Sequence, residues 1–416
     1  MLGNPSVARI VAARLISRTG GEAAFFVGIW GKAAYELDGT AADIALVIAA
    51  LGLTGLLGGA VAGMLIDRYN PKRVLLGSEL AFVPVALAFL TVDSLTGLVV
   101  VSAFLGLVSA PTFTSIASFP PFVTDDPAEL GRVNALVETA GMTALITGTA
   151  AGAALATWIG IDAIFVFDAL TSLVAVALVA TVRLRQIPQD EEPDGSGFEA
   201  IRRGFRYAFG HERLRFYLLV GGSVWLLFGL FSALEPLFYR DVLERGPETI
   251  GWVNTIFGIG LVAGTLLAGR LPDRLRSARL VLGLMALNGI GSAIYIGTDR
   301  IAVVIAGAVF WGAVIGVFAP AVRTMLHVNS PAPMIGRIMG VSQVIGEVAK
   351  LGPLLVAPLL AVRFGVQAPL AVSGSALTLL AAVGWRTGTR LDRTRTDPVP
   401  PIDHGRVADE PITQVP

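Results

Sequence analysis

The sequence predicts an all-α membrane protein in which twelve transmembrane helices form two pseudo-symmetric six-helix bundles. Charged residues make up only 15% of the 416 residues, against about 25% in soluble domains, and mean hydropathy is +0.72. Apolar stretches of about 20 residues recur along the chain, which is the length that a helix needs to cross a bilayer. The second half of the chain also repeats features of the first at a nearly constant offset.

Each apolar stretch is rich in Ala, Leu and Gly and does not alternate between apolar and polar residues. We therefore expect helices rather than strands. The predicted spans are 10–36, 42–66, 74–93, 95–119, 133–158, 161–182, 214–239, 248–270, 279–298, 301–325, 337–362 and 365–386. The start of the chain carries Arg9, Arg14 and Arg18 and lacks the clean apolar run of a signal peptide, so we expect a retained first helix.

The distribution of basic residues predicts the orientation in the membrane. An even number of spans places both termini on one side. If that side is the cytoplasm, most of the 31 basic residues fall in cytoplasmic segments, which is the usual bias. We therefore expect a multi-pass protein of the cell (inner or plasma) membrane with both termini in the cytoplasm.

The composition divides the chain into four regions. An acidic stretch with Pro and Gly at 187–197 is typical of a linker. The predicted regions are a first bundle at 1–186, a cytoplasmic linker with an interfacial helix at 187–213, a second bundle at 214–386 and a disordered cytoplasmic tail at 387–416.

The linker is expected to contain an amphipathic helix that lies in the membrane interface. An ordinary surface helix is the alternative. The expectation of an interfacial helix rests on four apolar side chains that share one helical face: Phe198, Ile201, Phe205 and Phe209.

An internal repeat at an offset of 205–206 residues supports two equivalent halves. The matching features are Gly52, Gly58, Gly63, Asp67, Arg68 and Arg73 with Gly258, Gly264, Gly269, Asp273, Arg274 and Arg279, and Gly160 with Gly365. Glycine is common here, with 48 residues, but the repeated Asp-Arg pair is harder to ascribe to chance. Two similar halves can rock about a central site. The repeated glycines allow helices to approach closely, either for sliding or for static packing.

Residues 63–73, Gly-Met-Leu-Ile-Asp-Arg-Tyr-Asn-Pro-Lys-Arg, resemble the loop signature of the major facilitator superfamily, Gly-x-x-x-Asp-Arg followed by Gly-Arg-Lys. The sequence departs from the signature at Asn70, where Gly is usual, and at Pro71. Because Asn tolerates a left-handed backbone, we expect the turn to survive. The resemblance extends over nearly the whole chain, including the repeat and the span number.

The resemblance implies a gating role for this loop. In the family the aspartate contacts the N-terminus of a helix in the other half when the cytoplasmic side is closed, an interaction that the helix dipole favours. Here that helix would begin near Gly336. A charged loop that only fixes topology is the alternative. The predicted gating residues are Gly63, Asp67, Arg68, Lys72, Arg73 and Arg337.

Three shorter stretches resemble the bacterial transmembrane-secretion-effector group, which holds enterobactin-exporter-like and macrolide-efflux-like proteins. They are residues 14–22, 204–207 and 336–340. The efflux signature of the fifth span is partial, because Thr149 stands after Gly148 where Pro is typical.

Charges inside the predicted spans need a reason, since each costs about 2.5–3.5 kcal/mol even on lenient scales. Arg18 and Glu22 stand at i and i+4 in the first span, and Glu22 is the first candidate for proton coupling. A structural ion pair is the alternative. Glu347 and Lys350, three residues apart, can also pair along their helix. Either the pair only neutralises itself, or protonation of Glu347 frees Lys350.

For the other charged residues in the spans, the sequence predicts only a general location or role. Arg14 is expected to reach the cytoplasmic interface. Glu79, Glu138 and Glu235 lie near span ends and are expected to be interfacial or gate residues, while Asp168 is expected to be structural.

The resemblance implies that spans 1, 4, 7 and 10 line a central cavity. The polar and aromatic candidates for its wall, including two from neighbouring spans, are Thr112, Ser115, Trp225, Asn254, Trp311 and Gln343. A mostly apolar pocket with a few polar groups suits an amphipathic organic cargo.

The remaining sequence features narrow the function. The chain has no Cys and only three scattered His, so we expect neither a metal site nor any other cofactor. A net charge of zero gives no reason to expect nucleic acid. Because a Gly-x-x-x-x-Gly-Lys-[Ser/Thr] motif is missing, a gradient rather than ATP should drive transport.

The sequence therefore predicts a proton-coupled exporter of amphipathic small molecules, such as drugs, siderophores or metabolites. It would be a secondary active transporter that works as a monomer in the lipid bilayer. An importer or facilitator on the same fold and a non-transporting scaffold or receptor are the alternatives. An enzyme is not expected, because no catalytic constellation is present.

Overall fold

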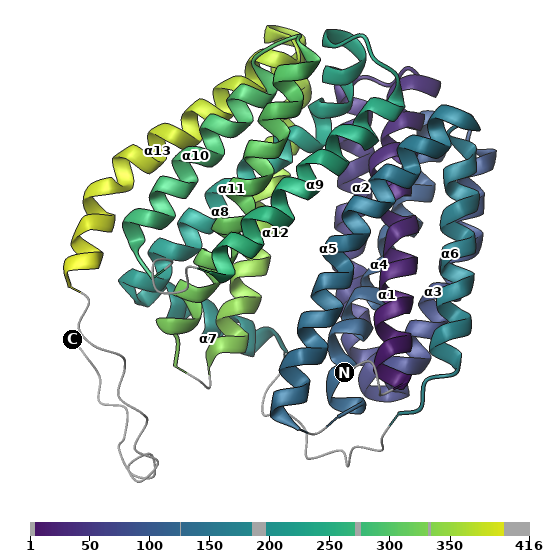
Figure 1. Cartoon of the computed structure of the whole chain (residues 1–416), viewed down its shortest axis with the longest axis horizontal. Coiled ribbons are helices and arrows are strands. Elements are labelled where there is room, and N and C mark those ends of the chain that lie inside the picture. The colour runs from purple at the N-terminus through teal and green to yellow at the C-terminus, as the bar shows by residue number, and fades with distance from the viewer. Residues whose placement is uncertain (1–4, 125, 185–196, 271–275, 332–333, 395–416) are drawn as a thin grey trace.

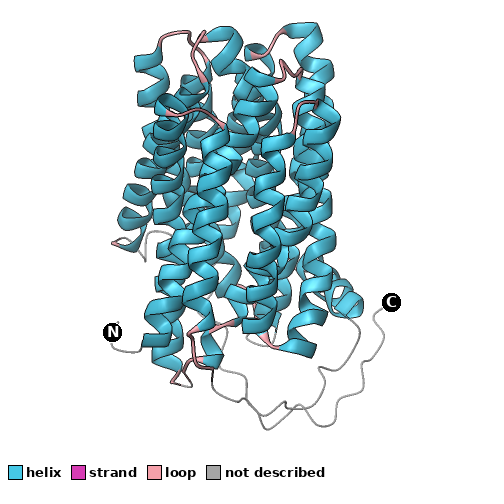
Figure 2. Cartoon of the chain, turned by 90° about the vertical axis from the view of Figure 1, so that its right-hand side faces the viewer, coloured by secondary structure: helices cyan, strands magenta, loops and turns pink. Residues whose placement is uncertain are grey.

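The computed structural model describes residues 5–124, 126–184, 197–270, 276–331 and 334–394. Within these residues the regular structure is helical throughout, with no strand (Figure 2). Figure 1 shows the helices gathered into two groups side by side, the first half of the chain in one and the second half in the other. The fold class predicted from the sequence is thus confirmed.

Six long helices build the first half. They are α1 (Pro5–Ala23), α2 (Ala41–Tyr69), α3 (Pro71–Ala88), α4 (Leu95–Ser118), α5 (Pro127–Trp158) and α6 (Asp162–Ala180). Short π-helical turns η1 (Ala24–Ile29) and η2 (Lys32–Glu36) continue α1, and 3₁₀ turns η3 (Phe89–Thr91) and η4 (Pro120–Phe122) follow α3 and α4.

Six further helices build the second half, after the connecting helix α7 (Gly197–Gly210). They are α8 (Glu212–Leu237), α9 (Pro247–Gly269), α10 (Ala278–Ile296), α11 (Ile301–Val328), α12 (Ile335–Phe364) and α13 (Gln367–Arg393). A π-helical turn, η5 (Phe238–Val242), continues α8.

Eleven of these helices are long and apolar enough to cross a membrane. The remaining predicted span, 10–36, corresponds to α1 with η1 and η2, whose charges, among them Arg14, Arg18 and Glu22, lower its hydropathy. It nevertheless runs inside the bundle, packed along α5 and α6 (Figure 1). A helix that carries charges can lie there because other helices, rather than lipid, surround it.

The two halves have the same internal packing. In the first half α1 packs on α5 and α6, α2 on α4, and α3 on α4 and α6. In the second half α8 packs on α12 and α13, α9 on α11, and α10 on α11 and α13. Each helix therefore has the neighbours of its counterpart, as the sequence repeat predicts.

The contacts between the halves follow the same symmetry. Helix α5 packs against α9, and α2 packs against α12. Since α12 is the counterpart of α5, and α9 of α2, one contact is the pseudo-two-fold image of the other. This is the geometry of two repeats facing each other across a central axis.

Rare backbone conformations also recur at the repeat offset. Asp38 and Glu244 both have positive φ, at 48° and 50°, after the π-helical end of the first helix of each half. Gly160 and Gly365 have φ of 125° and 75° at the fifth connection of each half. Such conformations are costly for residues with a Cβ, so their repetition indicates a shared backbone path.

The turn of the loop motif keeps its expected shape. Asn70 has φ of 67°, ends α2 and begins α3. Its side-chain oxygen accepts a hydrogen bond from the Arg73 backbone N–H at 3.1 Å, and Pro71 takes the first position of α3, where its missing N–H costs nothing.

The end of the chain differs from the expected tail. Helix α13 continues to Arg393, so residues 387–393 are helical, and the prediction of disorder is wrong for them. Ser277 and the backbone N–H groups that begin α10 donate to Asp392, which anchors this end of α13. The rest of the predicted tail and residues 187–196 lie outside the described residues.

The predicted interfacial helix is present as α7. Phe205 and Phe209 stack with their ring centres 5.9 Å apart, and Arg202 and Arg206 are exposed. A Cβ added to Gly204 would lie 3.3 Å from Arg337, so α7 packs on the start of α12. Its position in the membrane interface stays a prediction.

Candidate functional site

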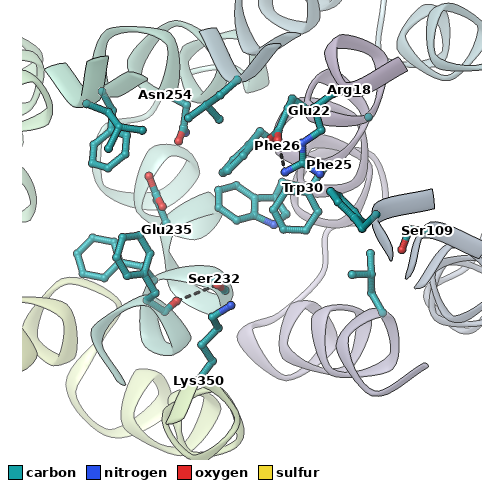
Figure 3. A pocket seen from close by; sticks show the side chains of 18 of the residues that line it. Arg18, Glu22, Phe25, Phe26, Trp30, Ser109, Ser232, Glu235, Asn254 and Lys350 are labelled. Carbon is teal, nitrogen blue, oxygen red and sulfur yellow. Dashed lines mark hydrogen bonds and ion pairs between the residues drawn. The ribbon is translucent and has the colours of Figure 1, made fainter. Parts of the chain in front are cut away.

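A cavity of about 640 Å³ lies between the two halves. Helices α1 to α5 with η1 line it from the first half, and α8 to α12 line it from the second. Figure 3 shows side chains from the two halves facing each other across it.

Aromatic rings form much of the wall. On the second half, Trp311 is the centre of a cluster and lies 4.8–5.6 Å, between ring centres, from its neighbours Phe228, Phe231, Phe257 and Tyr295. On the first half, Phe25, Phe26 and Trp30 pack together at 4.9–5.6 Å. The cavity can therefore bury a large apolar or aromatic body.

The charged part of the wall on the first half comes from α1. Arg18 forms an ion pair with Glu22, as their spacing predicts. The guanidinium groups of Arg14 and Arg18 both lie over the ring of Phe113 in α4, at 4.9 and 4.6 Å from its centre. These cation–π contacts hold the two cations beside α4 at the edge of the cavity.

A second ion pair lies on α12. Lys350 Nζ is 2.8 Å from Glu347 Oε1 and 4.6 Å from the ring centre of Trp225. Lys350 lines the cavity, whereas Glu347 does not and its side chain is 42% exposed. The pair predicted from the sequence is thus present, with only its cation at the cavity.

The sequence candidates divide into those at the cavity and those away from it. Arg18, Glu22, Thr112, Trp225, Asn254, Trp311 and Lys350 line the cavity. Ser115 is fully buried one turn beyond Thr112, and Gln343 is exposed on α12. Neither residue lines the cavity.

Two cavity residues differ from the sequence expectation. Arg14, expected at the interface, lines the cavity. Glu235, expected near a span end, is only 8% exposed and lines the cavity as well. Tyr295 of α10 and Tyr239 of η5 both donate hydrogen bonds to Glu235 Oε1.

Glu79 was also expected to be interfacial, and that expectation is wrong. Its side chain is 1% exposed inside the first half, where Ser17 of α1 donates a 2.8 Å hydrogen bond to Oε1. Asp168 of α6 is also buried, against α1, and its structural role stays a prediction. Long-range partners such as these give no signal in the local sequence.

One end of the cavity is closed by contacts between the halves. Arg240 Nη1 in η5 donates to the carbonyl oxygens of Ala34 and Gly39 at 2.5 and 3.2 Å, and it pairs with Asp38 at 3.0 Å. Tyr35 donates to the Arg245 carbonyl at 2.9 Å. Because α8 begins directly after α7 and η5 continues its far end, these contacts lie at the end of the second half opposite α7.

The predicted gating loop lies at the other end. Lys72 donates to the carbonyls of Ala180 and Val182 in its own half, at 2.8 and 2.7 Å. Arg68 lies over the ring of Tyr69, and Arg73, Gly63 and Arg337 belong to helix ends there. The side chain of Asp67 lies outside the described part of the structure.

Two pseudo-symmetric helical bundles around a central cavity define the class of alternating-access membrane transporters. The sequence profile of the Major Facilitator Superfamily matches residues 10–246 and 217–413. The chain belongs to this superfamily, and it is a membrane transporter rather than an enzyme.

Curated relatives cover most of the chain at low identity. The 3-(3-hydroxy-phenyl)propionate transporter of Escherichia coli (strain K12) is 26% identical over 77% of this chain and 79% of its own. Macrolide efflux protein A of Streptococcus pyogenes is 23% identical over 82% of this chain and 86% of its own. The relatives thus include both efflux and other transport proteins.

Solved structures agree on the fold. The nucleoside transporter NupG has a TM-score of 0.74 at 10% identity, covering 92% of this chain and 99% of its own. An inward-facing, unoccupied bacterial homologue of the lysosomal transporter Spinster has a TM-score of 0.74 at 12% identity, covering 95% and 98%. The D-xylose-proton symporter has a TM-score of 0.67 at 15% identity, covering 91% and 97%.

Proposed function

We propose that this transporter is a proton-coupled exporter of amphipathic small molecules and that it works as a monomer in the cell membrane. The observation that supports this most is the central cavity, which combines an aromatic wall with ionisable groups from both halves. Aromatic rings suit an apolar body, and the few charged groups suit a polar end and a coupling proton.

Alternating access would proceed by rocking of the two halves. In the structure, side-chain contacts of η2 and η5 close the end opposite α7. The basic segments predict that the α7 end is cytoplasmic, so this conformation would receive cargo from the cytoplasm. In the opposite conformation, Asp67 would contact the start of α12 near Arg337 and close the cytoplasmic end.

Proton coupling is assigned to Glu22 and its partner Arg18. A proton on Glu22 would break the ion pair and leave Arg18 with an uncompensated charge in the cavity wall, and cargo binding would then depend on protonation. Glu347 and Lys350 form a second pair of the same kind on the other half. Exchange of protons for cargo at one cavity is the simplest scheme that uses these groups.

The direction of transport is proposed from one relative. Macrolide efflux protein A exports by its name. Import is the second candidate, because the hydroxyphenylpropionate transporter carries no efflux designation. Macrolides and aromatic acids both combine an apolar body with polar groups, so the proposed cargo class is the same for either direction.

Transport into everted vesicles with an imposed proton gradient tests the proposal, using ethidium, erythromycin and 3-phenylpropionate as probes. Wild-type vesicles with an acidic lumen should accumulate at least one probe, and a protonophore should abolish the accumulation. Glu22→Gln should lower the gradient-driven accumulation by about a hundredfold or more, the lower end of the usual range for a proton-transfer group, while still exchanging the probe down its own gradient.

Glu36→Gln is the matched control, because Glu36 pairs with Lys32 at the same i, i+4 spacing on the same span but outside the cavity. It should transport as wild type does. Gradient-driven accumulation that is unchanged in Glu22→Gln would remove the coupling assignment. Accumulation only under the reversed gradient would favour import.

A further inference from the structure

The ionisable groups of the cavity differ in whether they have an ionic partner. Five such side chains line it, and they are Arg14, Arg18, Glu22, Glu235 and Lys350. Arg18 pairs with Glu22, and Lys350 pairs with Glu347. Within the described residues no carboxylate forms an ion pair with Arg14, and its Nε is buried without a hydrogen-bond partner.

Several charged groups surround Arg14 without contacting it. Arg18 and Glu22 follow it on α1, Glu79 faces it from α3 and Glu138 from α5. Arg18 already binds Glu22, and Ser17 binds Glu79. Glu138 is exposed. These carboxylates lower the cost of the buried cation, but none of them occupies its hydrogen-bonding edge.

Arg14 lines the cavity, and its guanidinium carbon lies over the Phe113 ring, 4.9 Å from the ring centre. Because its Nε is buried, the terminal N–H groups are the part of the guanidinium that a ligand in the cavity would meet. Guanidinium N–H groups have the fork geometry that matches a carboxylate. An unpaired charge at this depth is costly, and an anionic ligand would remove most of that cost.

We propose that Arg14 binds an anionic group of the cargo, so that the preferred cargo is an organic anion with an aromatic body, such as an aromatic carboxylate. This inference rests on the proposed function, because it requires that the cavity accept cargo. The aromatic body would pack against the cluster around Trp311, across the cavity from α1.

The charge balance of the wall supports the same orientation. With all five side chains ionised, the wall carries three positive and two negative charges. Glu235 lies on the second half, facing the residues of the first half across the cavity (Figure 3). It disfavours an anion near α8, and therefore directs the anionic end toward α1 and the apolar end toward α8 and α11.

Binding to the purified full-length protein in phosphatidylcholine nanodiscs tests the inference. The fluorescence of Trp30, Trp225 and Trp311, which line the cavity, reports occupancy. The probes are 3-phenylpropionate, its neutral analogue 3-phenylpropanamide and the cation 3-phenylpropylamine. The carboxylate should bind wild type about tenfold more tightly than the amide, as expected for a charge-assisted hydrogen bond, and the amine should bind no more tightly than the amide.

Variants assign the preference to one residue. Arg14→Gln should bring the carboxylate-to-amide ratio close to one while keeping amide binding, and Arg14→Lys should keep part of the ratio because it retains the charge. Arg9→Gln is the matched control, since Arg9 is on the same helix but donates to the Thr181 carbonyl at 3.0 Å outside the cavity. It should keep the wild-type ratio.

Each result distinguishes the inference from the proposed function. Equal binding of the three probes, or a carboxylate preference that persists in Arg14→Gln, overturns the assignment of Arg14 and leaves the cavity as the cargo site. Failure of all three probes to bind wild type overturns the inference, whereas the proposed function fails only if the vesicles also accumulate neither ethidium nor erythromycin. Loss of carboxylate binding in discs with added phosphatidylglycerol would show a lipid headgroup on Arg14 and would also overturn the cargo assignment.

Discussion

At the scale of single residues, the carboxyl group of Glu235 depends on its two phenol partners. Tyr295 comes from α10 and Tyr239 from the π-helical turn after α8, and both donate to the same oxygen. Pro236 follows immediately inside α8, where it removes one helical hydrogen bond. The network therefore ties α10 to the point where α8 changes its helical geometry.

We predict that Tyr295→Phe destabilises the protein by about 1 kcal/mol or more, because a buried acceptor loses its closest donor. Tyr239→Phe should cost less, since that hydrogen bond is longer at 3.3 Å. Thermal unfolding in detergent measures both. In a Glu235→Leu background the cost of Tyr295→Phe should fall, and an equal cost in both backgrounds would show that the two side chains do not interact.

Ion pairs within one helix can be predicted from the sequence, whereas partners from different helices cannot. Arg18 with Glu22 and Glu347 with Lys350 follow from the helical repeat alone. Ser17, the partner of Glu79, and Tyr295, the closer partner of Glu235, lie 62 and 60 positions away. They depend on how each helix is rotated about its axis, which a sequence without pairing information does not specify.

At the scale of helices, close packing between α9 and α11 depends on glycine. A Cβ on Gly264 would overlap the carbonyl group of Ala313, and one on Gly260 would overlap the carbonyl oxygen of Val309. On α11, a Cβ on Gly312 or Gly316 would likewise overlap a backbone carbonyl oxygen of α9. The equivalent pair, α2 and α4, has the same kind of contact at Gly58 and Gly106.

We predict that Gly264→Ala destabilises the protein by about 1–3 kcal/mol, because the added methyl group forces the two helices apart. Gly59→Ala is the matched control: no atom of a neighbouring helix lies within 4 Å of its Cβ position. It should be neutral or stabilising by up to about 1 kcal/mol, from helix propensity. Unfolding temperatures in detergent compare the two, and similar losses for both would contradict the packing argument.

The more hydrophobic a helix is, the better the sequence predicts it. The long apolar stretches predict α2 to α6 and α8 to α13 because each helix must satisfy its backbone inside the bilayer. The π-helical turns η1, η2 and η5 had no counterpart in the sequence analysis. The polar residues after Trp385 predict a tail, yet α13 continues to Arg393, because a helix that leaves the bilayer can end in water.

At the scale of the whole molecule, the repeat is expressed in the packing of the halves and in the seam between them. Equivalent helices have equivalent neighbours, and the two seam contacts, α5 with α9 and α2 with α12, exchange under the pseudo-two-fold operation. The sequence predicts the repeat because glycine positions and loop charges are kept at one offset. It does not predict which end of the cavity is closed, since both conformations contain the same helices.

Arg240 joins the halves at the closed end through the carbonyl groups at the end of η2. Helix C-termini carry partial negative charge, so a guanidinium there stabilises the contact. The predicted contact of Asp67 with the N-terminus of α12 would be the electrostatic inverse at the other end. Each would stabilise one of the two conformations, and cargo would shift the population between them.

We therefore predict that Arg240→Ala shifts the protein toward the conformation that is open at the end opposite α7. The chain has no native cysteine, so Ser232→Cys places a single reactive thiol in the cavity. A membrane-impermeant maleimide should label it several-fold faster from the extracellular side in Arg240→Ala than in the parent, and more slowly from the cytoplasmic side. Arg300→Ala, which removes a charge at the start of α11, should leave both rates unchanged. Asp67→Asn should change them in the opposite sense, and parallel changes in Arg240→Ala and Asp67→Asn would contradict a pair of opposed gates.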